Sequence, residues 1–84
     1  MRKHINIVGV GRRMAGVGKT SNNPYDFTPV SFTYEDSRTN GVKAATCNIN
    51  QTDMGSYTPC VGDLVEVVMR EDYRSGKVYV DAVI

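Results

Sequence analysis

Alternating apolar and polar residues recur along the chain, and this period of two predicts β-strands. No stretch of about a dozen residues keeps the spacing of apolar positions that an amphipathic helix needs. Five runs carry the strand pattern, and they span residues 5–10, 25–34, 42–49, 64–70 and 77–84. The last run places four apolar residues on one face: Val78, Val80, Ala82 and Ile84.

The second run changes phase at Pro29. Tyr25 and Phe27 share one face before the proline, whereas Phe32 and Tyr34 share a face after it. Proline donates no hydrogen bond within a sheet and is typical of strand edges and bulges. We therefore expect a β-bulge near Pro29.

Turn residues and longer loops separate the runs. Asn40-Gly41 and Ser75-Gly76 each favour a tight hairpin, because such turns need residues that tolerate positive φ. Residues 11–24 and 50–63 form two longer connections. Five strands, two long loops and no repeats predict an all-β, five-stranded, OB-fold-like Greek-key barrel, since a sandwich usually needs about seven strands.

The 84 residues are enough for one domain, residues 1–84, with a modest core that a partner subunit would help to stabilise. No apolar stretch approaches the ~20 residues of a membrane span, and the N-terminus lacks the features of a secretory signal peptide. We therefore expect a cytoplasmic protein without membrane contact. Cys47 and Cys60 are then expected to be free thiols.

The net charge of +1 conceals an uneven distribution of charge. Residues 1–25 hold no acidic residue and five basic ones, namely Arg2, Lys3, Arg12, Arg13 and Lys19. Residues 26–84 hold five basic and nine acidic residues. A basic end on an otherwise acidic domain suggests a surface for a polyanion, and a solvated terminus and loop is the alternative interpretation.

The glycine-rich segment 9–20 ends in Gly18-Lys19-Thr20, as a phosphate-binding loop does. That motif needs a glycine at position 13, where Arg13 stands, and a helix after it, where Ser21 to Pro24 follows. His4 and the scattered acidic residues form neither a metal site nor a nucleophile–base pair. We expect no enzymatic activity, no metal and no cofactor.

Aromatic residues stand near basic residues at three places. These are Tyr25 and Phe27 after Arg12, Arg13 and Lys19; Tyr34 near Arg38; and Tyr73 beside Arg74. Single-stranded nucleic acid is bound by such surfaces, because cations follow the phosphates and exposed rings stack on bases. Tyr25 and Tyr73 are the main stacking candidates, whereas Phe27, Phe32 and Tyr79 also fit packing between strands.

The order of these features resembles the filamentous-phage single-stranded-DNA-binding proteins of the gene V protein type. A glycine-rich basic excursion follows the first strand, and Asn23-Pro24-Tyr25-x-Phe27 opens the second. The chain length, the Pro59 to Gly62 segment and the aromatic hairpin near the C-terminus are also similar. The resemblance covers most of the chain as a pattern, and its most specific element is Asn-Pro-Tyr-x-Phe.

The resemblance implies a projecting β-ribbon that lies along DNA, and a homodimer. Arg12, Arg13 and Lys19 would contact phosphates, and Tyr25 would stack on a base. The last hairpin would pack about the dimer dyad, so that Tyr73 adds an aromatic ring to the partner's groove. Lys43 would supply the cation of the third strand, whereas Asp81 stands about where the family usually has a basic residue.

We therefore expect a non-enzymatic phage protein of the host cytoplasm that coats single-stranded DNA cooperatively, without sequence preference, as a homodimer. It would hold replicated strands for packaging. An RNA-binding, cold-shock-like OB module is a second hypothesis, although such modules usually carry a denser aromatic and basic run on adjacent strands. A small protein-interaction barrel with a solvated basic loop is a third.

Overall fold

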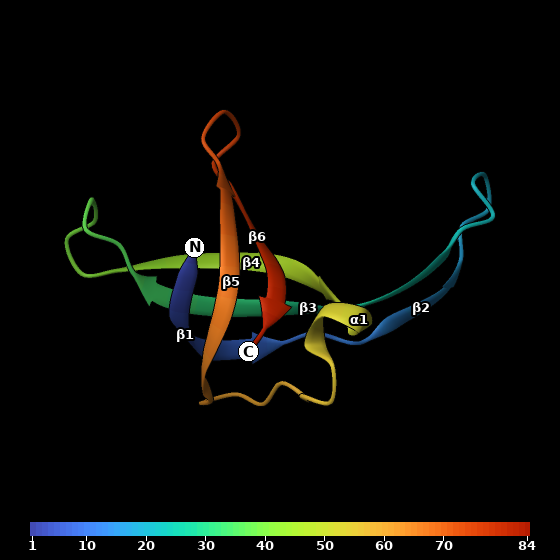
Figure 1. The fold of residues 1–84 in the computed structure, drawn as a ribbon, viewed down its shortest axis with the longest axis horizontal. Helices are drawn as coiled ribbons and strands as arrows, with labels where there is room; N and C mark the ends of the chain where they lie inside the picture. Colours follow the sequence, from blue (N-terminus) through green and yellow to red (C-terminus); the bar gives the residue numbers. More distant parts are fainter.

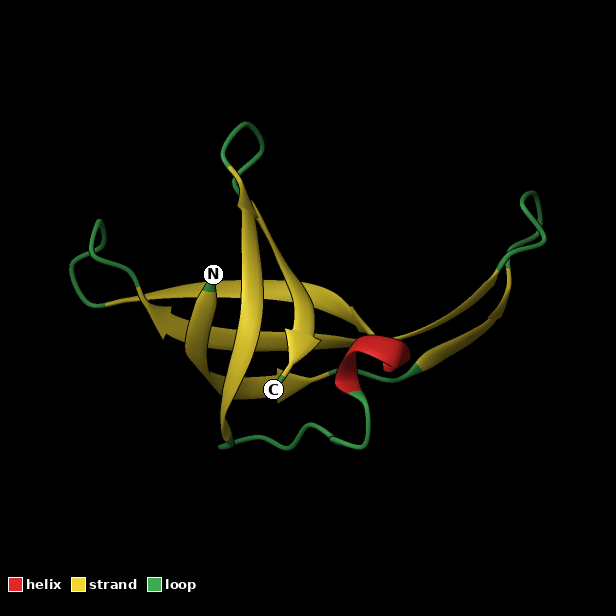
Figure 2. Cartoon of the chain, viewed as in Figure 1, coloured by secondary structure: helices red, strands yellow, loops and turns green.

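The protein is built almost entirely of β-strands. The computed structural model describes all 84 residues and contains one antiparallel sheet of six strands with one short helix (Figure 1, Figure 2). In chain order the elements are β1 (Arg2–Val10), β2 (Met14–Val17), β3 (Pro24–Glu35), β4 (Val42–Asn50), α1 (Gln51–Met54), β5 (Leu64–Asp72) and β6 (Lys77–Val83). The all-β prediction is confirmed.

The longest strand, β3, organises the sheet. One edge of β3 pairs first with β2 and then with β1, whereas the other edge pairs with β4 from Phe27 to Glu35. β5 pairs with β1, and β6 with β5. The sheet curls until β4 packs against β6, which forms the body of the molecule. Residues 11–27 project from this body as a two-stranded ribbon (Figure 1).

The interior of the body is a single hydrophobic cluster. Its buried members come from all strands of the body and from α1: Ile5, Ile7, Val30, Phe32, Tyr34, Ile49, Met54, Val67, Met69, Val78 and Val80. The ribbon contributes no buried residue. Its shape therefore depends on hydrogen bonds and cross-strand contacts rather than on a core.

The expected bulge near Pro29 is wrong. β3 alternates without interruption because the buried Thr28 occupies an inward position, which leaves Phe27 on the outward face. The Pro29 carbonyl oxygen accepts a hydrogen bond from the Gly11 N–H, so the proline nitrogen faces the gap between β1 and β2. On this edge of β3 neither β1 nor β2 pairs with Pro29. The missing N–H of the proline therefore costs no hydrogen bond of the sheet.

The register shifts lie in other strands. β1 has an extra residue between Ile7 and Gly9, and β6 has one between Val80 and Ala82. The shift in β6 reverses the facing of its last residues. Val83 packs against the core, whereas Ile84 is exposed, so the predicted single apolar face of the last run ends at Val80.

The alternation pattern predicts neither β2 nor α1, although the family resemblance implies the ribbon to which β2 belongs. All four residues of β2 are exposed, so this strand shows no inward–outward alternation. α1 is a single turn, too short to display a helical period, although its Met54 is buried in the core. No helix is long and apolar enough to cross a membrane. Both predicted hairpins are present, with φ of 95° at Gly41 and 73° at Gly76. Their loops, residues 36–41 and 73–76, are longer than the tight turns that the sequence predicts.

Candidate nucleic-acid interface

The two faces of the ribbon differ in chemistry. Cross-strand pairing sets Gly16 opposite Tyr25. It also sets Met14 opposite Phe27 on the same face. Asp26 points to the opposite side, because successive side chains of a strand alternate. One face of the ribbon therefore carries Met14, Tyr25 and Phe27, and Asp26 lies on the other face with Ala15.

The Tyr25 ring rests on the backbone of the ribbon at Gly16. A Cβ atom at Gly16 would lie 2.8 Å from the Tyr25 hydroxyl oxygen and 3.1 Å from Cζ. Phe27 flanks the ring, with the two ring centroids 6.0 Å apart and the planes tilted by 38°. Tyr25 is nevertheless 42% exposed. A ring that is supported behind and open in front can stack on a base.

The three predicted cations of the ribbon are not equivalent. Arg13 donates from Nε to the Asp26 carboxylate at 2.7 Å and also pairs with it through Nη2. This bond lowers the pKa of Asp26 and raises that of Arg13. Arg12 and Lys19 form no ion pair. Two of the three predicted phosphate contacts therefore carry charge that is not compensated within the chain.

An uncharged polar surface continues from the aromatic face of the ribbon across β3 and β4. Asn50 is opposite Phe27, and Asn48 follows on the same face of β4. Further along, the hydroxyl groups of Ser31 and Thr46 share a hydrogen bond of 2.9 Å. Amide and hydroxyl groups can hydrogen-bond to bases and sugars without a charge.

A groove of about 460 Å³ lies between β4 and the start of β6, lined by residues 43–48 and 76–79. Lys77, at the start of β6, lines this groove and forms no ion pair. In Figure 1, the ribbon and the β5–β6 hairpin project from the body in different directions. The groove thus adjoins the hairpin that carries the exposed Tyr73, and the uncharged surface adjoins the ribbon that carries the exposed Tyr25.

Two predicted site residues are placed differently from the expectation. Tyr34 is only 4% exposed, because it lies at an inward position of β3, so its ring cannot stack on a base. Burial raises the pKa of Tyr34, and its hydroxyl group has no hydrogen-bond partner. Lys43 donates to Glu71 at 3.3 Å and lies 3.9 Å from Asp36. Its charge is therefore compensated within the body.

Tyr73 and Arg74 occupy the tip of the β5–β6 hairpin, as the sequence predicts. Tyr73 is 77% exposed. The Asp72 carboxylate accepts hydrogen bonds from the Arg74 N–H at 3.0 Å and the Ser75 hydroxyl at 3.0 Å, which orders the turn. Arg38, which the sequence places near Tyr34, has its guanidinium carbon 5.6 Å from the Tyr73 ring centroid.

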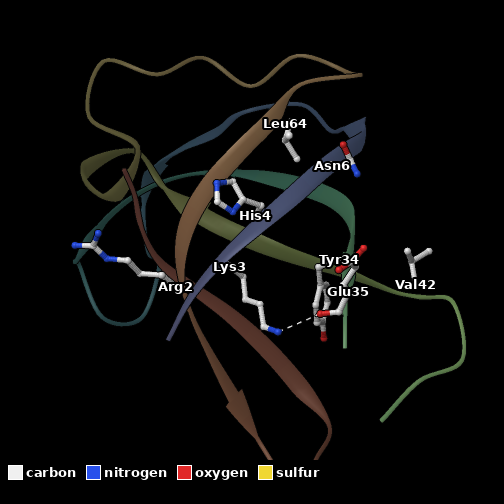
Figure 3. A pocket seen from close by; sticks show the side chains of 8 residues that line it. All are labelled: Arg2, Lys3, His4, Asn6, Tyr34, Glu35, Val42 and Leu64. Atoms are coloured by element: carbon white, nitrogen blue, oxygen red, sulfur yellow. Dashed lines mark hydrogen bonds between the residues drawn. The ribbon is translucent and has the colours of Figure 1, made fainter. Parts of the chain in front are cut away.

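A second pocket, of about 440 Å³, lies beside the start of β1 (Figure 3). Lys3 Nζ donates to the backbone carbonyl oxygen of Glu35 at 3.1 Å (Figure 3). The Arg2 side chain points away from both of these residues (Figure 3). His4 Nε2 lies 4.0 Å from the Glu66 carboxylate. These basic groups do not converge on one point. No group of three or more His, Cys, Asp or Glu residues is placed to hold a metal ion.

Comparisons with protein-family models, curated proteins and solved structures find no match to this chain. The resemblance to the gene V protein type therefore rests on the sequence pattern described above.

Proposed function

We propose that the protein binds single-stranded DNA without sequence preference and has no enzymatic role. The observation that carries this proposal is the ribbon, which combines the uncompensated cations Arg12 and Lys19 with the supported, exposed ring of Tyr25. Cations that follow the phosphates and rings that stack on bases are the two parts of a sequence-independent single-strand site.

The uncharged surface beside the ribbon favours single strands over duplex. Stacking needs bases that are not paired with a second strand. A duplex reader usually places a helix in the major groove, and the only helix here has four residues. The Asn, Ser and Thr side chains of β3 and β4 would meet unpaired bases, while Arg12, Lys19 and Lys77 would follow the phosphates at the edges of this surface.

The arrangement of the strands supports an OB-type Greek-key barrel as the finer description of the fold. The order around the body is β1-β3-β4, then β6-β5 back to β1, with α1 between β4 and β5 along the chain. OB-folds bind oligonucleotides on the face of their second and third strands and on two loops. Here the corresponding strands are β3 and β4, and the loops are the ribbon and the 73–76 hairpin tip.

The biological setting that we propose is a filamentous phage, whose replicated strands the protein would coat cooperatively in the host cytoplasm before packaging. The sequence resemblance supports this setting. A homodimer is part of the proposal, because a small core gains stability from a partner. In a twofold dimer, Tyr73 would complete the partner's groove.

Titration of fluorescently labelled oligo-dT at low and high salt tests the function. A plot of the logarithm of the binding constant against the logarithm of the salt concentration should have a slope of about −1.4 or steeper, from about −0.7 for each of Arg12 and Lys19. Duplex DNA of the same length should bind more weakly. Equal or tighter binding of oligo-U would support the RNA-binding module instead. If no nucleic acid binds, the protein-interaction barrel is the remaining hypothesis.

Sedimentation at micromolar concentration tests the dimer. We expect about twice the 9.3 kDa mass of one chain. Tyr73→Ala should weaken DNA binding and leave the dimer largely intact, because the tip residue would contact the ligand rather than hold the subunits together. A monomer that binds DNA with full affinity would contradict both the dimer and the role of Tyr73 across it.

A further inference from the structure

Ion pairs join the loop between β3 and β4 to the end of strand β5, which is distant in sequence. Arg38, in the loop between these strands, donates to both oxygens of the Asp36 carboxylate at 3.2 and 3.1 Å. The same guanidinium donates to Glu71 of β5 at 3.0 Å. Lys43 of β4 donates to the other oxygen of Glu71 at 3.3 Å. The 36–41 loop is thereby fastened to the base of the β5–β6 hairpin.

The carboxylates of this network are enclosed, whereas its arginine faces outward. The side chains of Asp36 and Glu71 are 9% and 11% exposed, and that of Arg38 is 58% exposed. Arg38 also donates its backbone N–H to Asp36 at 3.0 Å. Bidentate arginine–carboxylate bonds fix the plane of the guanidinium group. Arg38 is therefore held rigidly from the inside and presents the rest of its surface to the solvent.

The Tyr73 ring lies on this guanidinium group. Its centroid is 5.6 Å from the Arg38 Cζ atom, within the range of a cation–π contact. Tyr73 has little else to pack on and is the most exposed large hydrophobic residue of the chain. The contact leaves much of the ring open. Arg38 therefore supports Tyr73 much as the Gly16 backbone supports Tyr25.

We propose that Arg38 is a positioning residue, which the Asp36–Glu71–Lys43 network orients so that Tyr73 is held ready to stack on a base of single-stranded DNA. This inference rests on the proposed function. Because two carboxylates compensate Arg38 and Lys43, Arg38 acts through the ring and not as a phosphate contact. Ordering a side chain before binding removes that entropy cost from the binding step.

The contact between Arg38 and Tyr73 can be measured without DNA. Protons held over the face of an aromatic ring are shifted upfield, so the side-chain methylene protons of Arg38 should be shifted in the wild type and not in Tyr73→Leu. Asp36→Asn keeps both Arg38 and Tyr73 but removes the bidentate carboxylate. We expect this variant to return the Arg38 protons most of the way to their Tyr73→Leu positions. Arg38 protons that are unshifted in the wild type would overturn the contact.

Binding of oligo-dT by Arg38→Gln, Tyr73→Ala and the double variant tests the role of the contact. We expect Tyr73→Ala to weaken binding by about 5- to 150-fold and Arg38→Gln by about 2- to 10-fold. Arg38→Gln should add no further loss in the Tyr73→Ala background, and it should leave the salt slope unchanged. Arg38→Lys should behave like Arg38→Gln, because an ammonium group cannot make the planar, bidentate contacts.

Arg70→Gln is the matched control. Arg70 lies 4.5 Å from the Tyr79 ring centroid and pairs with Asp81 at 3.3 Å, but it does not join the 36–41 loop. It should bind oligo-dT as the wild type does. If the wild type binds and Arg38→Gln weakens binding equally with and without Tyr73, or flattens the salt slope by about 0.7, the positioning role is overturned. If the wild type does not bind, the proposed function fails, whatever the proton shifts show.

Discussion

The two exposed tyrosines of the chain are supported in opposite ways. Tyr25 lies on the glycine backbone of the ribbon, near the uncompensated cations Arg12 and Lys19. Tyr73 lies on Arg38, whose charge is compensated by two enclosed carboxylates. The same combination of aromatic and basic residues therefore has two physical meanings. On the ribbon Arg12 and Lys19 form no ion pair, whereas beside the hairpin Arg38 is paired with Asp36 and Glu71.

This difference shows that the acidic partner decides what a basic residue does. Arg13 and Lys43 were both predicted as phosphate contacts, and both are paired with carboxylates in the structure. Exposed ion pairs contribute little stability on their own. They still lower the positive potential that a phosphate would meet. The electrostatic part of the proposed DNA binding is thus expected from Arg12, Lys19 and Lys77, with a smaller share from Arg13.

The largest effect is expected from a change in the hydrophobic core, because both the ribbon and the β5–β6 hairpin depend on a folded body. Phe32→Ala removes a fully buried ring and should lower the free energy of unfolding by about 3–5 kcal/mol, measured by urea denaturation. In a domain this small, that loss should unfold much of the protein and abolish both sites. Val17→Ala, on the exposed ribbon, should change stability by less than about 0.5 kcal/mol. A similar loss for both variants would contradict the independence of the ribbon from the core.

Gly16→Val should separate the two tyrosines. Its Cβ atom would meet the Tyr25 hydroxyl end, so the ring must shift away from Gly16 and loses its support there. We expect oligo-dT binding at high salt to weaken by about 1–3 kcal/mol, the value of one stacked base, with little change in stability. Tyr25→Ala should match this loss, while Tyr25→Phe should nearly preserve binding. Adding Gly16→Val to Tyr25→Ala should cost nothing more; a full additional loss would mean that Gly16 acts independently of the ring.

The salt dependence of binding should distinguish the cations of the ribbon from those of the hairpin. Replacing Arg12 and Lys19 together by Ala should flatten the log–log slope by about 1.4, and adding Arg13→Ala should bring the change toward about two units. Asp26→Asn should steepen the slope by up to about 0.7, because it releases Arg13. Lys43→Ala serves as the comparison and should change the slope little. A flattening with Lys43→Ala as large as that from either ribbon residue would place it on the phosphates.

The smallest effect concerns pH at the hairpin. The hydrogen bonds from Arg38 lower the pKa of Asp36 from 3.8 to about 2. The folded state therefore binds the Asp36 proton less readily than the unfolded state. The stabilising contribution of this carboxylate is complete above about pH 4 and is lost as the pH falls through about 2. A carboxyl NMR titration should show this midpoint, and Arg38→Gln should move it back toward 3.8. An unchanged midpoint in Arg38→Gln would contradict the assigned cause.

The alternation of apolar residues was enough to predict an all-β fold and the five strands of the body, and the turn residues predicted the two hairpins. These features follow from local chemistry, since strand periodicity and positive-φ glycines act within a few residues of the chain. Patterns of that kind do not report what lies across a sheet. Continuous alternation through Pro29 depends on Thr28 being buried, and β2 becomes a strand only because β3 pairs with it.

The candidate site divides in the same way. The sequence by itself determined the basic excursion, the exposed Tyr73 at a hairpin tip and the Asn-Pro-Tyr-x-Phe segment, because these are properties of neighbouring residues. Only the tertiary structure decided that Tyr34 is enclosed, that Lys43 is compensated and that Arg38 meets Tyr73. Each of those outcomes joins residues from different strands or loops. Burial and ion pairing depend on the distance between residues in space, and the separation of two residues along the chain does not determine that distance.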